Sequence, residues 1–114
     1  MKLTRGTVVL VALDPTFGHE QQGIRPCVVV TDPEVLHDQR FPMLCVVPIT
    51  RTQGEGALYP ALSPGQSGLR VPSYALVDQV RSVDKRRVTR VFGRINQDEM
   101  RMIEEGLRLF LGLH

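Results

Sequence analysis

The chain has 114 residues, of which 42% are hydrophobic and 23% are charged, and its formal net charge is +2. This length predicts a single domain over residues 1–114, with enough apolar residues for a core. The sequence has no run of about eighteen apolar residues, so we expect no membrane-spanning segment. The first residues also lack a long apolar run, which argues against a signal peptide and favours a cytoplasmic protein.

Short β-branched and apolar segments, separated by turn residues, occupy most of the chain. Strands are expected at residues 7–13, 27–31, 43–49, 58–62, 74–80 and 88–95. Pro48 lies inside the third segment and predicts an edge position or a bulge, because proline cannot donate to a sheet ladder. Cys27 and Cys45 lie in apolar runs, which indicates reduced buried thiols, with a disulfide between neighbouring strands as the alternative.

The last segment of the chain changes to helical periodicity. Asn96 is a typical N-cap residue, and Glu99, three residues later, would complete a capping box. The apolar residues that follow recur at helical spacing and form one stripe: Met100, Ile103, Leu107, Phe110 and Leu111. We expect this stripe to pack in the core or in an interface. Many short strands closed by one helix predict a mainly β protein with a small, strongly bent sheet or open barrel.

A long polar loop follows the first predicted strand. From Asp14 to Arg25 it holds a histidine, two carboxylates, two amides and an arginine within twelve residues, and Pro26 comes next. Hairpin connections usually need only about two to five residues. Binding and catalytic residues often lie on loops that a rigid scaffold positions. We therefore expect part of a functional site in this loop.

Three motifs of the chain resemble the MazF/PemK/Kid family of bacterial toxins. The first is Leu-Asp-Pro-Thr at residues 13–16, followed by Gly-His-Glu-Gln-Gln-Gly at 18–23 and then Arg25-Pro26. The second is Val-Pro-Ile-Thr at 47–50, and the third is Asp-Gln-Val-Arg-Ser-Val-Asp-Lys at 78–85. The three motifs occur in the family's order, and the resemblance covers nearly the whole chain.

The resemblance implies a fold, an activity and partners. The implied fold is an SH3-like small barrel of bent antiparallel strands with a C-terminal helix, of the MazF/Kid/CcdB type, in a two-fold homodimer. The implied activity is sequence-selective cleavage of single-stranded RNA without a cofactor, as the toxin of a toxin–antitoxin pair. The implied partner is a cognate antitoxin with an acidic, flexible segment, which suits the basic residues between positions 81 and 94.

RNA can be cleaved without a metal, because its 2′-hydroxyl can attack the adjacent phosphorus and leave a 2′,3′-cyclic phosphate and a 5′-hydroxyl. The reaction needs a base, an acid and cationic or hydrogen-bonding groups that stabilise the phosphorane. The sequence has no HExxH, no closely spaced Cys/His set and no acidic cluster of the two-metal kind. This pattern favours the metal-free route.

Arg25 and Thr50 are the first candidates for catalysis, and the resemblance implies them as a catalytic pair. A guanidinium is permanently charged and presents two donors to phosphate oxygens, which suits transition-state stabilisation rather than base catalysis. The alternative for Arg25 is an ion pair with Glu20 or Asp14. The alternative for Thr50 is a hydroxyl that caps the end of a strand.

His19 and Asp78 have supporting or alternative catalytic roles. The ordinary pKa of histidine lies near neutrality, so His19 can act as acid or base, whereas a lone loop histidine is more often only solvated. A Kid-like branch of the family implies catalysis by an aspartate matching Asp78, together with an arginine two residues before it. This chain has Leu76 at that position, which disfavours the Asp–Arg scheme.

A further set of side chains is predicted to bind RNA: Asp14, Phe17, Glu20, Gln21, Gln79, Arg81, Lys85 and Arg86. Amides read the edges of unstacked bases, an aromatic ring stacks on them, and basic side chains follow the phosphate backbone. The alternatives are local: amide hydrogen bonds within the loop, a Phe17 that packs the loop down, a Glu20 that orients Arg25, and an Arg81 paired with Asp78 or Asp84.

The sequence also allows two other functions. One is a non-catalytic module that binds RNA or an antitoxin. The other is a poison of a protein target, because the related CcdB toxins share the fold and act on gyrase. The intact Gly-His-Glu-Gln-Gln-Gly and Arg-Pro motifs favour the nuclease.

Overall fold

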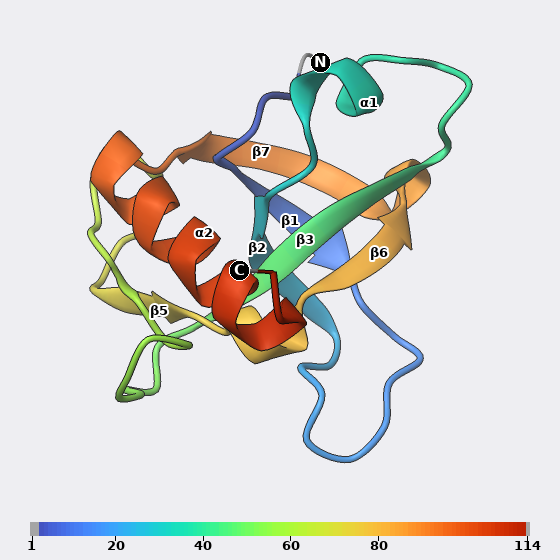
Figure 1. The fold of residues 1–114 in the computed structure, drawn as a ribbon. Helices are drawn as coiled ribbons and strands as arrows, with labels where there is room; N and C mark the ends of the chain where they lie inside the picture. Colours follow the sequence, from blue (N-terminus) through green and yellow to red (C-terminus); the bar gives the residue numbers. More distant parts are fainter. Residues whose placement is uncertain (1–2, 114) are drawn as a thin grey trace.

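A curled antiparallel sheet with one long helix forms the molecule, as Figure 1 shows for a computed structural model that describes residues 3–113. Residues 1, 2 and 114, which the predicted domain includes, lie outside the described range. The strands are β1 (Thr7–Ala12), β2 (Ile24–Val29), β3 (Met43–Thr50), β4 (Ala61–Leu62), β5 (Ser73–Ala75), β6 (Arg81–Asp84) and β7 (Val88–Arg94). The helices are α1 (Pro33–Leu36), α2 (Gln97–Leu111) and the 3-10 helices η1 (Val77–Gln79) and η2 (Lys85–Arg87).

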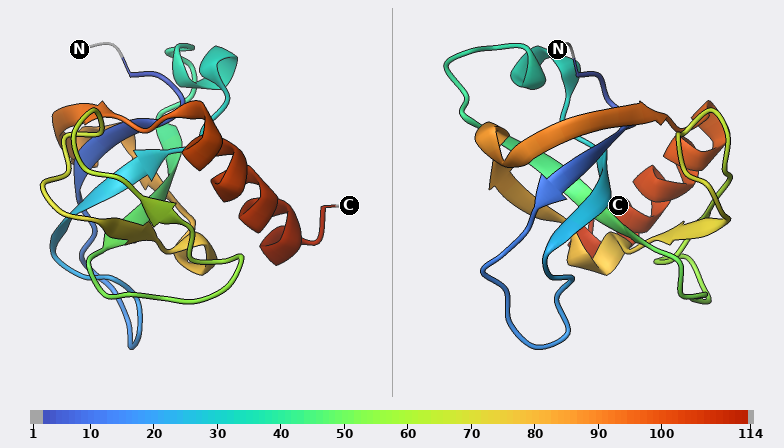
Figure 2. Two further views of the ribbon diagram at one scale, coloured as in Figure 1. Left: turned by 90° about the vertical axis from the view of Figure 1, so that its left-hand side faces the viewer. Right: turned by 180° about the vertical axis from the view of Figure 1, so that it is seen from behind.

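The strands follow the order β4-β5-β3-β2-β1-β7, and β6 pairs separately with β3. Each pairing is antiparallel, including Val8 with Val28 and Cys27 with Pro48. The sheet bends into a half-barrel, and the views in Figure 2 show β7 crossing above β1 while α2 lies along one side. This architecture confirms the predicted mainly β fold.

Side chains that alternate along the central strands form two apolar clusters on opposite faces of the sheet. Val8 packs with Ile103 of α2 and with Val77, whereas Val9 and Val11 belong to the second cluster with Val83. Successive side chains of a strand point to opposite faces of the sheet. A strand whose residues are nearly all apolar therefore has to be covered on both faces. The first strand is accordingly buried along most of its length.

Helix α2 begins at the predicted capping box. The Asn96 side chain accepts a hydrogen bond from the Glu99 N–H at 2.8 Å, and Glu99 accepts one from the Asn96 N–H at 3.0 Å. Ile103 is buried, but Phe110 and Leu111 are exposed in the single chain. The predicted stripe therefore meets this chain's core only in its first part.

Two strand predictions were wrong in part. The segment 74–80 is divided into β5 and η1, and β6 follows as a separate strand, because the chain turns from one partner position on β3 to another. The segment 58–62 contains only the two-residue β4. Helix α1 was not predicted at all; it starts with Asp32 as its N-cap and with Pro33 in its first turn.

Pro48 does not lie at a sheet edge, so that part of its prediction was wrong. It is in the central strand β3, between the residues that pair with β6 (Met43–Val46) and those that pair with β5 (Ile49, Thr50). Its carbonyl accepts a hydrogen bond from the Leu76 N–H at 2.8 Å. The N–H and the carbonyl of a strand residue point to the same side, so the nitrogen of Pro48 faces the gap between β5 and β6. No ladder hydrogen bond is lost there.

Within the described residues, no helix is long and apolar enough to cross a membrane. Cys27 and Cys45 are both free thiols, and Cys27 is fully buried. Burial raises the pKa of the Cys27 thiol to about 12, with Arg81 partly opposing the shift.

Candidate active site

The polar loop between β1 and β2 extends away from the sheet, as both views in Figure 2 show. Two arginines from β6 and η2 hold its start. Arg81 donates to the Leu13 carbonyl at 3.0 Å, and Arg87 donates to the Ala12 carbonyl at 3.0 Å. The Gln79 side chain holds its middle, because it accepts from the Gln21 N–H at 2.6 Å and donates to the His19 carbonyl at 3.2 Å. The loop is therefore attached at both places to the segment 79–87.

Arg25 and Thr50 lie on the neighbouring strands β2 and β3. Cys27 pairs with Pro48, and continuing that register by two residues places Arg25 opposite Thr50. The Arg25 guanidinium is exposed and donates through Nε to the Gln22 carbonyl at 3.0 Å. It forms no ion pair within residues 3–113, so the alternative of a pairing with Glu20 or Asp14 is wrong.

Thr50 caps the end of its strand, as the structural alternative for it predicted. Its hydroxyl oxygen accepts a hydrogen bond from the Thr52 N–H at 3.1 Å, so it does cap the end of β3. That bond uses a lone pair of the oxygen and leaves the hydroxyl proton free to donate. The side chain is thus oriented and still able to bind a phosphate oxygen.

Arg25 and Thr50 share a pocket of about 380 Å³, which we call the arginine pocket. Arg51 follows β3 and Arg70 precedes β5, and both also line this pocket. No carboxylate is among its lining residues. Three guanidinium groups beside one cavity create a positive potential that attracts an anion.

His19 and Asp78 line a different cavity of about 350 Å³, which we call the loop pocket, together with Glu20, Gln21, Pro48, Gln79, Val80 and Arg81. Pro48 lines the loop pocket while Ile49 and Thr50 line the arginine pocket. The two cavities therefore flank the end of β3, and the structure separates the four predicted catalytic residues into two pairs.

Asp78 has one satisfied and one unsatisfied oxygen. Its Oδ2 accepts a hydrogen bond from the Tyr59 hydroxyl at 2.8 Å, and this bond raises the pKa of Tyr59. Its Oδ1 is buried and has no hydrogen-bond partner among the described residues. A buried carboxylate oxygen without a donor is costly, so a donor from a ligand would be favourable there.

The predicted RNA-binding residues of the loop have different surroundings. Asp14 is exposed and accepts from the Thr16 hydroxyl at 3.3 Å. Phe17 is 88% exposed, so it does not pack the loop down. Glu20 accepts a hydrogen bond from the Phe17 N–H instead of orienting Arg25, and that alternative is wrong.

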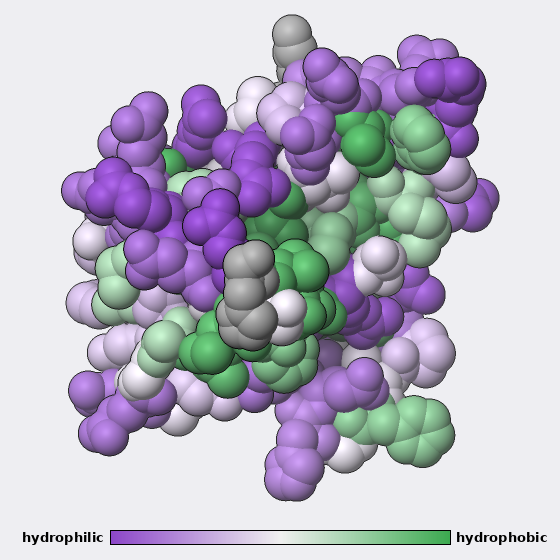
Figure 3. Space-filling model, viewed as in Figure 1, coloured by the Kyte–Doolittle hydropathy of each residue, from purple (hydrophilic) through white to green (hydrophobic). Residues whose placement is uncertain are grey.

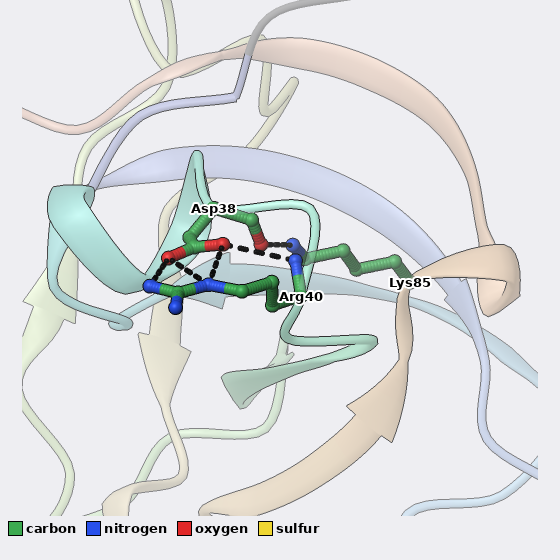
Figure 4. A network of polar contacts seen from close by, with 3 residues as sticks. All are labelled: Asp38, Arg40 and Lys85. Carbon is green, nitrogen blue, oxygen red and sulfur yellow. Dashed lines mark hydrogen bonds and ion pairs between the residues drawn. The ribbon is translucent and has the colours of Figure 1, made fainter.

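The basic residues between positions 81 and 94 do not form one free surface. Arg81 donates to the loop and pairs with neither Asp78 nor Asp84, contrary to the alternatives considered for it. Arg86 forms an ion pair with Asp84 at 3.0 Å. Lys85 donates to the carbonyl of Leu36 at 2.9 Å and to that of Asp38, beside the Asp38–Arg40 ion pair (Figure 4).

The functional side chains that sequence reasoning missed include Arg51 and Arg70, which line the arginine pocket, and Tyr59, which donates to Asp78. Each lies between two strands in the structure, and none belongs to the three motifs of the family resemblance. Their proximity to Arg25 or Asp78 results from the folding of β3, β4 and β5. Among residues 3–113, no group of three His, Cys, Asp or Glu side chains is arranged to hold a metal ion.

The family profile described as "PemK-like, MazF-like toxin of type II toxin-antitoxin system" matches residues 4–111. The chain belongs to this toxin family. Endoribonuclease PemK of Escherichia coli is 40% identical over 88 residues, which cover 72% of this chain and 61% of that protein. Endoribonuclease MazF9 of Mycobacterium tuberculosis is 32% identical over 117 residues, which cover 97% of this chain and 98% of MazF9.

Solved structures of PemK/MazF toxins have the same fold. MazF from Deinococcus radiodurans aligns with a TM-score of 0.80 at 26% identity, over 95% of this chain and 94% of that chain. An endoribonuclease from a mycobacterial species, in complex with its cognate antitoxin, also aligns with a TM-score of 0.80, at 20% identity, over 99% of this chain and 98% of that one.

Proposed function

We propose that this PemK/MazF family member is a sequence-selective endoribonuclease that cleaves single-stranded RNA by attack of the 2′-hydroxyl, without a metal ion. The observation that carries the proposal is that Arg25 and Thr50, on the neighbouring strands β2 and β3, line one cationic pocket that contains no carboxylate. The names of the relatives support the activity, since PemK, MazF9 and EndoA are endoribonucleases.

In the proposed reaction, the 2′-oxygen forms a bond to phosphorus while the bond from phosphorus to the 5′-oxygen breaks. The 2′-hydroxyl proton passes to a base, and the leaving 5′-oxygen takes a proton from an acid. Arg25 and the Thr50 hydroxyl donate to the phosphate oxygens, where negative charge accumulates in the phosphorane. His19 and Asp78 line the adjacent loop pocket, and we assign proton transfer to this pair.

Sequence selectivity is assigned to the loop pocket. The Gln79 carboxamide forms hydrogen bonds with the loop, which was the alternative for this amide. We therefore assign it the role of positioning the loop rather than reading a base. The Gln21 carboxamide has no hydrogen-bond partner among the described residues and lines the pocket. Such an amide can bind the Watson–Crick edge of an unstacked base, and the exposed Phe17 ring can stack on one.

We propose two protein partners. One is an acidic antitoxin, because the mycobacterial and Deinococcus neighbours were solved with their antitoxins. The other is a second copy of the chain. The apolar side chains at the end of α2 are exposed, namely Leu109, Phe110, Leu111 and Leu113. Figure 3 shows hydrophobic surface there, which a dimer would cover.

The activity is tested by incubating the purified protein with a mixed-sequence single-stranded RNA in EDTA and mapping the product ends. We expect 2′,3′-cyclic phosphate and 5′-hydroxyl ends, and loss of cleavage in Arg25→Ala. Arg101→Ala is the matched control, since Arg101 is an exposed arginine that pairs with Asp98 on α2. Cleavage that requires magnesium and leaves 5′-phosphates would overturn the mechanism.

A pH–rate profile separates the roles in the loop pocket. If His19 transfers a proton, His19→Ala loses one limb of the profile, whereas Thr50→Ala lowers the rate at every pH. An unchanged profile in His19→Ala would remove the imidazole from the reaction. RNA binding without any cleavage by the parent protein would instead support the non-catalytic module.

A further inference from the structure

The arginine pocket holds more positive charge than one phosphodiester requires. Its three arginines come from three separate segments, β2, the residues after β3 and the residues before β5. Arg51 and Arg70 are exposed and form no side-chain hydrogen bond or ion pair within residues 3–113. Other arginines of the chain, such as Arg5, Arg86 and Arg101, do have carboxylate partners.

A bound anion would stabilise this arrangement. Like charges beside one cavity repel each other, and the pocket has no acidic residue that would compensate them. A guanidinium binds phosphate through two parallel N–H donors, so the arginines beyond Arg25 can hold a second phosphate group. The charge of the pocket thus fits a ligand with at least two anionic groups.

The remaining walls of the pocket fit a nucleotide. Ile24 is 62% exposed and Val71 is 37% exposed, and both line the same cavity as the arginines. Exposed apolar side chains beside cations match the alternation of bases and phosphates in single-stranded RNA. The volume of about 380 Å³ exceeds what one phosphate group fills, since pockets for whole small ligands begin at about 300 Å³.

We propose that Arg51 and Arg70 form a second phosphate subsite, which binds a backbone phosphate of the RNA adjacent to the scissile one held by Arg25. This inference rests on the proposed function and extends it to the substrate's length: productive binding requires a phosphate beside the cleaved bond. Arg51 and Arg70 bind substrate here, and neither takes part in bond breaking.

The first test measures binding alone, with an RNA that carries 2′-deoxyribose at the cleavage site and therefore cannot react. Its affinity is measured by fluorescence anisotropy across a series of salt concentrations. A lost phosphate contact lowers the slope of log K against log salt by about 0.7 for a single strand. We expect this decrease in Arg51→Gln and in Arg70→Gln, and an unchanged slope in the control Arg101→Gln.

The second test measures cleavage with two substrates that differ in one phosphate. A neutral methylphosphonate beside the scissile bond should raise KM about tenfold in the parent protein, the loss expected for one charge-assisted contact, and leave kcat nearly unchanged. In Arg51→Gln and in Arg70→Gln, the methylphosphonate should have a much smaller further effect, because each variant has already lost part of the contact with this phosphate. Additive effects in both variants would overturn the subsite.

The outcomes also separate the inference from the proposed function. If the parent cleaves RNA but both arginine variants keep its salt slope, the subsite is wrong and the nuclease stands. If the parent binds uncleavable RNA with an arginine-dependent slope but cleaves nothing, the nuclease is wrong and the subsite stands. If the substitutions weaken only the binding of an acidic antitoxin peptide, the pocket belongs to that partner and the RNA subsite is overturned.

Discussion

The Gln79 carboxamide joins two loop positions that lie about sixty residues away in sequence: its oxygen accepts from the Gln21 N–H at 2.6 Å, and its nitrogen donates to the His19 carbonyl at 3.2 Å. Gln79 belongs to η1, which packs against α2 and β3. A side chain on the rigid part of the molecule therefore determines where the loop, and with it His19, lies relative to Asp78.

Substituting Gln79 by alanine should release the loop without unfolding the protein. Loss of one such hydrogen bond costs about 1 kcal/mol, so amide hydrogen exchange at Gln21 should become about fivefold faster. RNA cleavage should fall by about tenfold, since the site is less well positioned. Gln79→Glu keeps the acceptor for Gln21 and should retain most of the protection. If exchange at Gln21 is the same in Gln79→Ala as in the parent, the bond does not hold the loop.

Gly106→Ala should destabilise the protein, although alanine normally stabilises a helix interior by about 1 kcal/mol relative to glycine. A Cβ at Gly106 would lie 2.8 Å from the Ala57 carbonyl oxygen and 3.2 Å from a methyl group of Val77. Overpacking of this kind costs about 1–3 kcal/mol, so we expect a net loss. Urea denaturation measures it, with the exposed Glu105→Ala as control. A more stable Gly106→Ala variant would show that α2 can move away from the segment between β3 and β4 that contains Ala57.

Stability should decrease at alkaline pH because of Cys27. Burial raises the pKa of this thiol from 9.0 to about 12, so the folded state keeps a proton that the unfolded state releases. The contribution of the protonated Cys27 thiol to the free energy of unfolding is fully present below pH 9 and is lost as the pH rises from 9 to about 12. In Cys27→Ala, the free energy of unfolding should be lower at neutral pH and should fall less steeply in that window. Equal slopes in the two proteins would contradict this assignment.

Tyr59 should report on the charge of Asp78. The hydrogen bond to Asp78 is the largest cause of the raised pKa of the Tyr59 hydroxyl, followed by desolvation and by repulsion between phenolate and carboxylate. In Asp78→Asn the pKa of Tyr59 should fall toward its ordinary value. Ultraviolet titration of tyrosinate measures this shift, and a Tyr74→Phe background leaves Tyr59 as the only tyrosine. A titration that does not move would show that the bond is not formed.

Local sequence was sufficient for the elements that depend on neighbouring residues. The capping box of Asn96 and Glu99 occurs as predicted, since both partners lie within one helical turn. The prediction of one strand at 74–80 was wrong because the division of this segment into β5 and η1 depends on which part of β3 each residue meets. The alternative that Glu20 orients Arg25 was wrong for a different, local reason: the Glu20 carboxylate accepts a hydrogen bond from the Phe17 N–H, three residues before it.

The order of residues along this chain determined most of its strands, its capped helix and the identity of Arg25 and Thr50 as candidates, because these follow from periodicity, local hydrogen bonding and family motifs. Only the tertiary structure decided that Arg25 has no carboxylate partner, that Arg51 and Arg70 join it, and that His19 and Asp78 line a separate cavity. Those relationships connect strands and loops that are distant in sequence. They arise from how the sheet curls and from which strand each segment pairs with, and no local pattern encodes either.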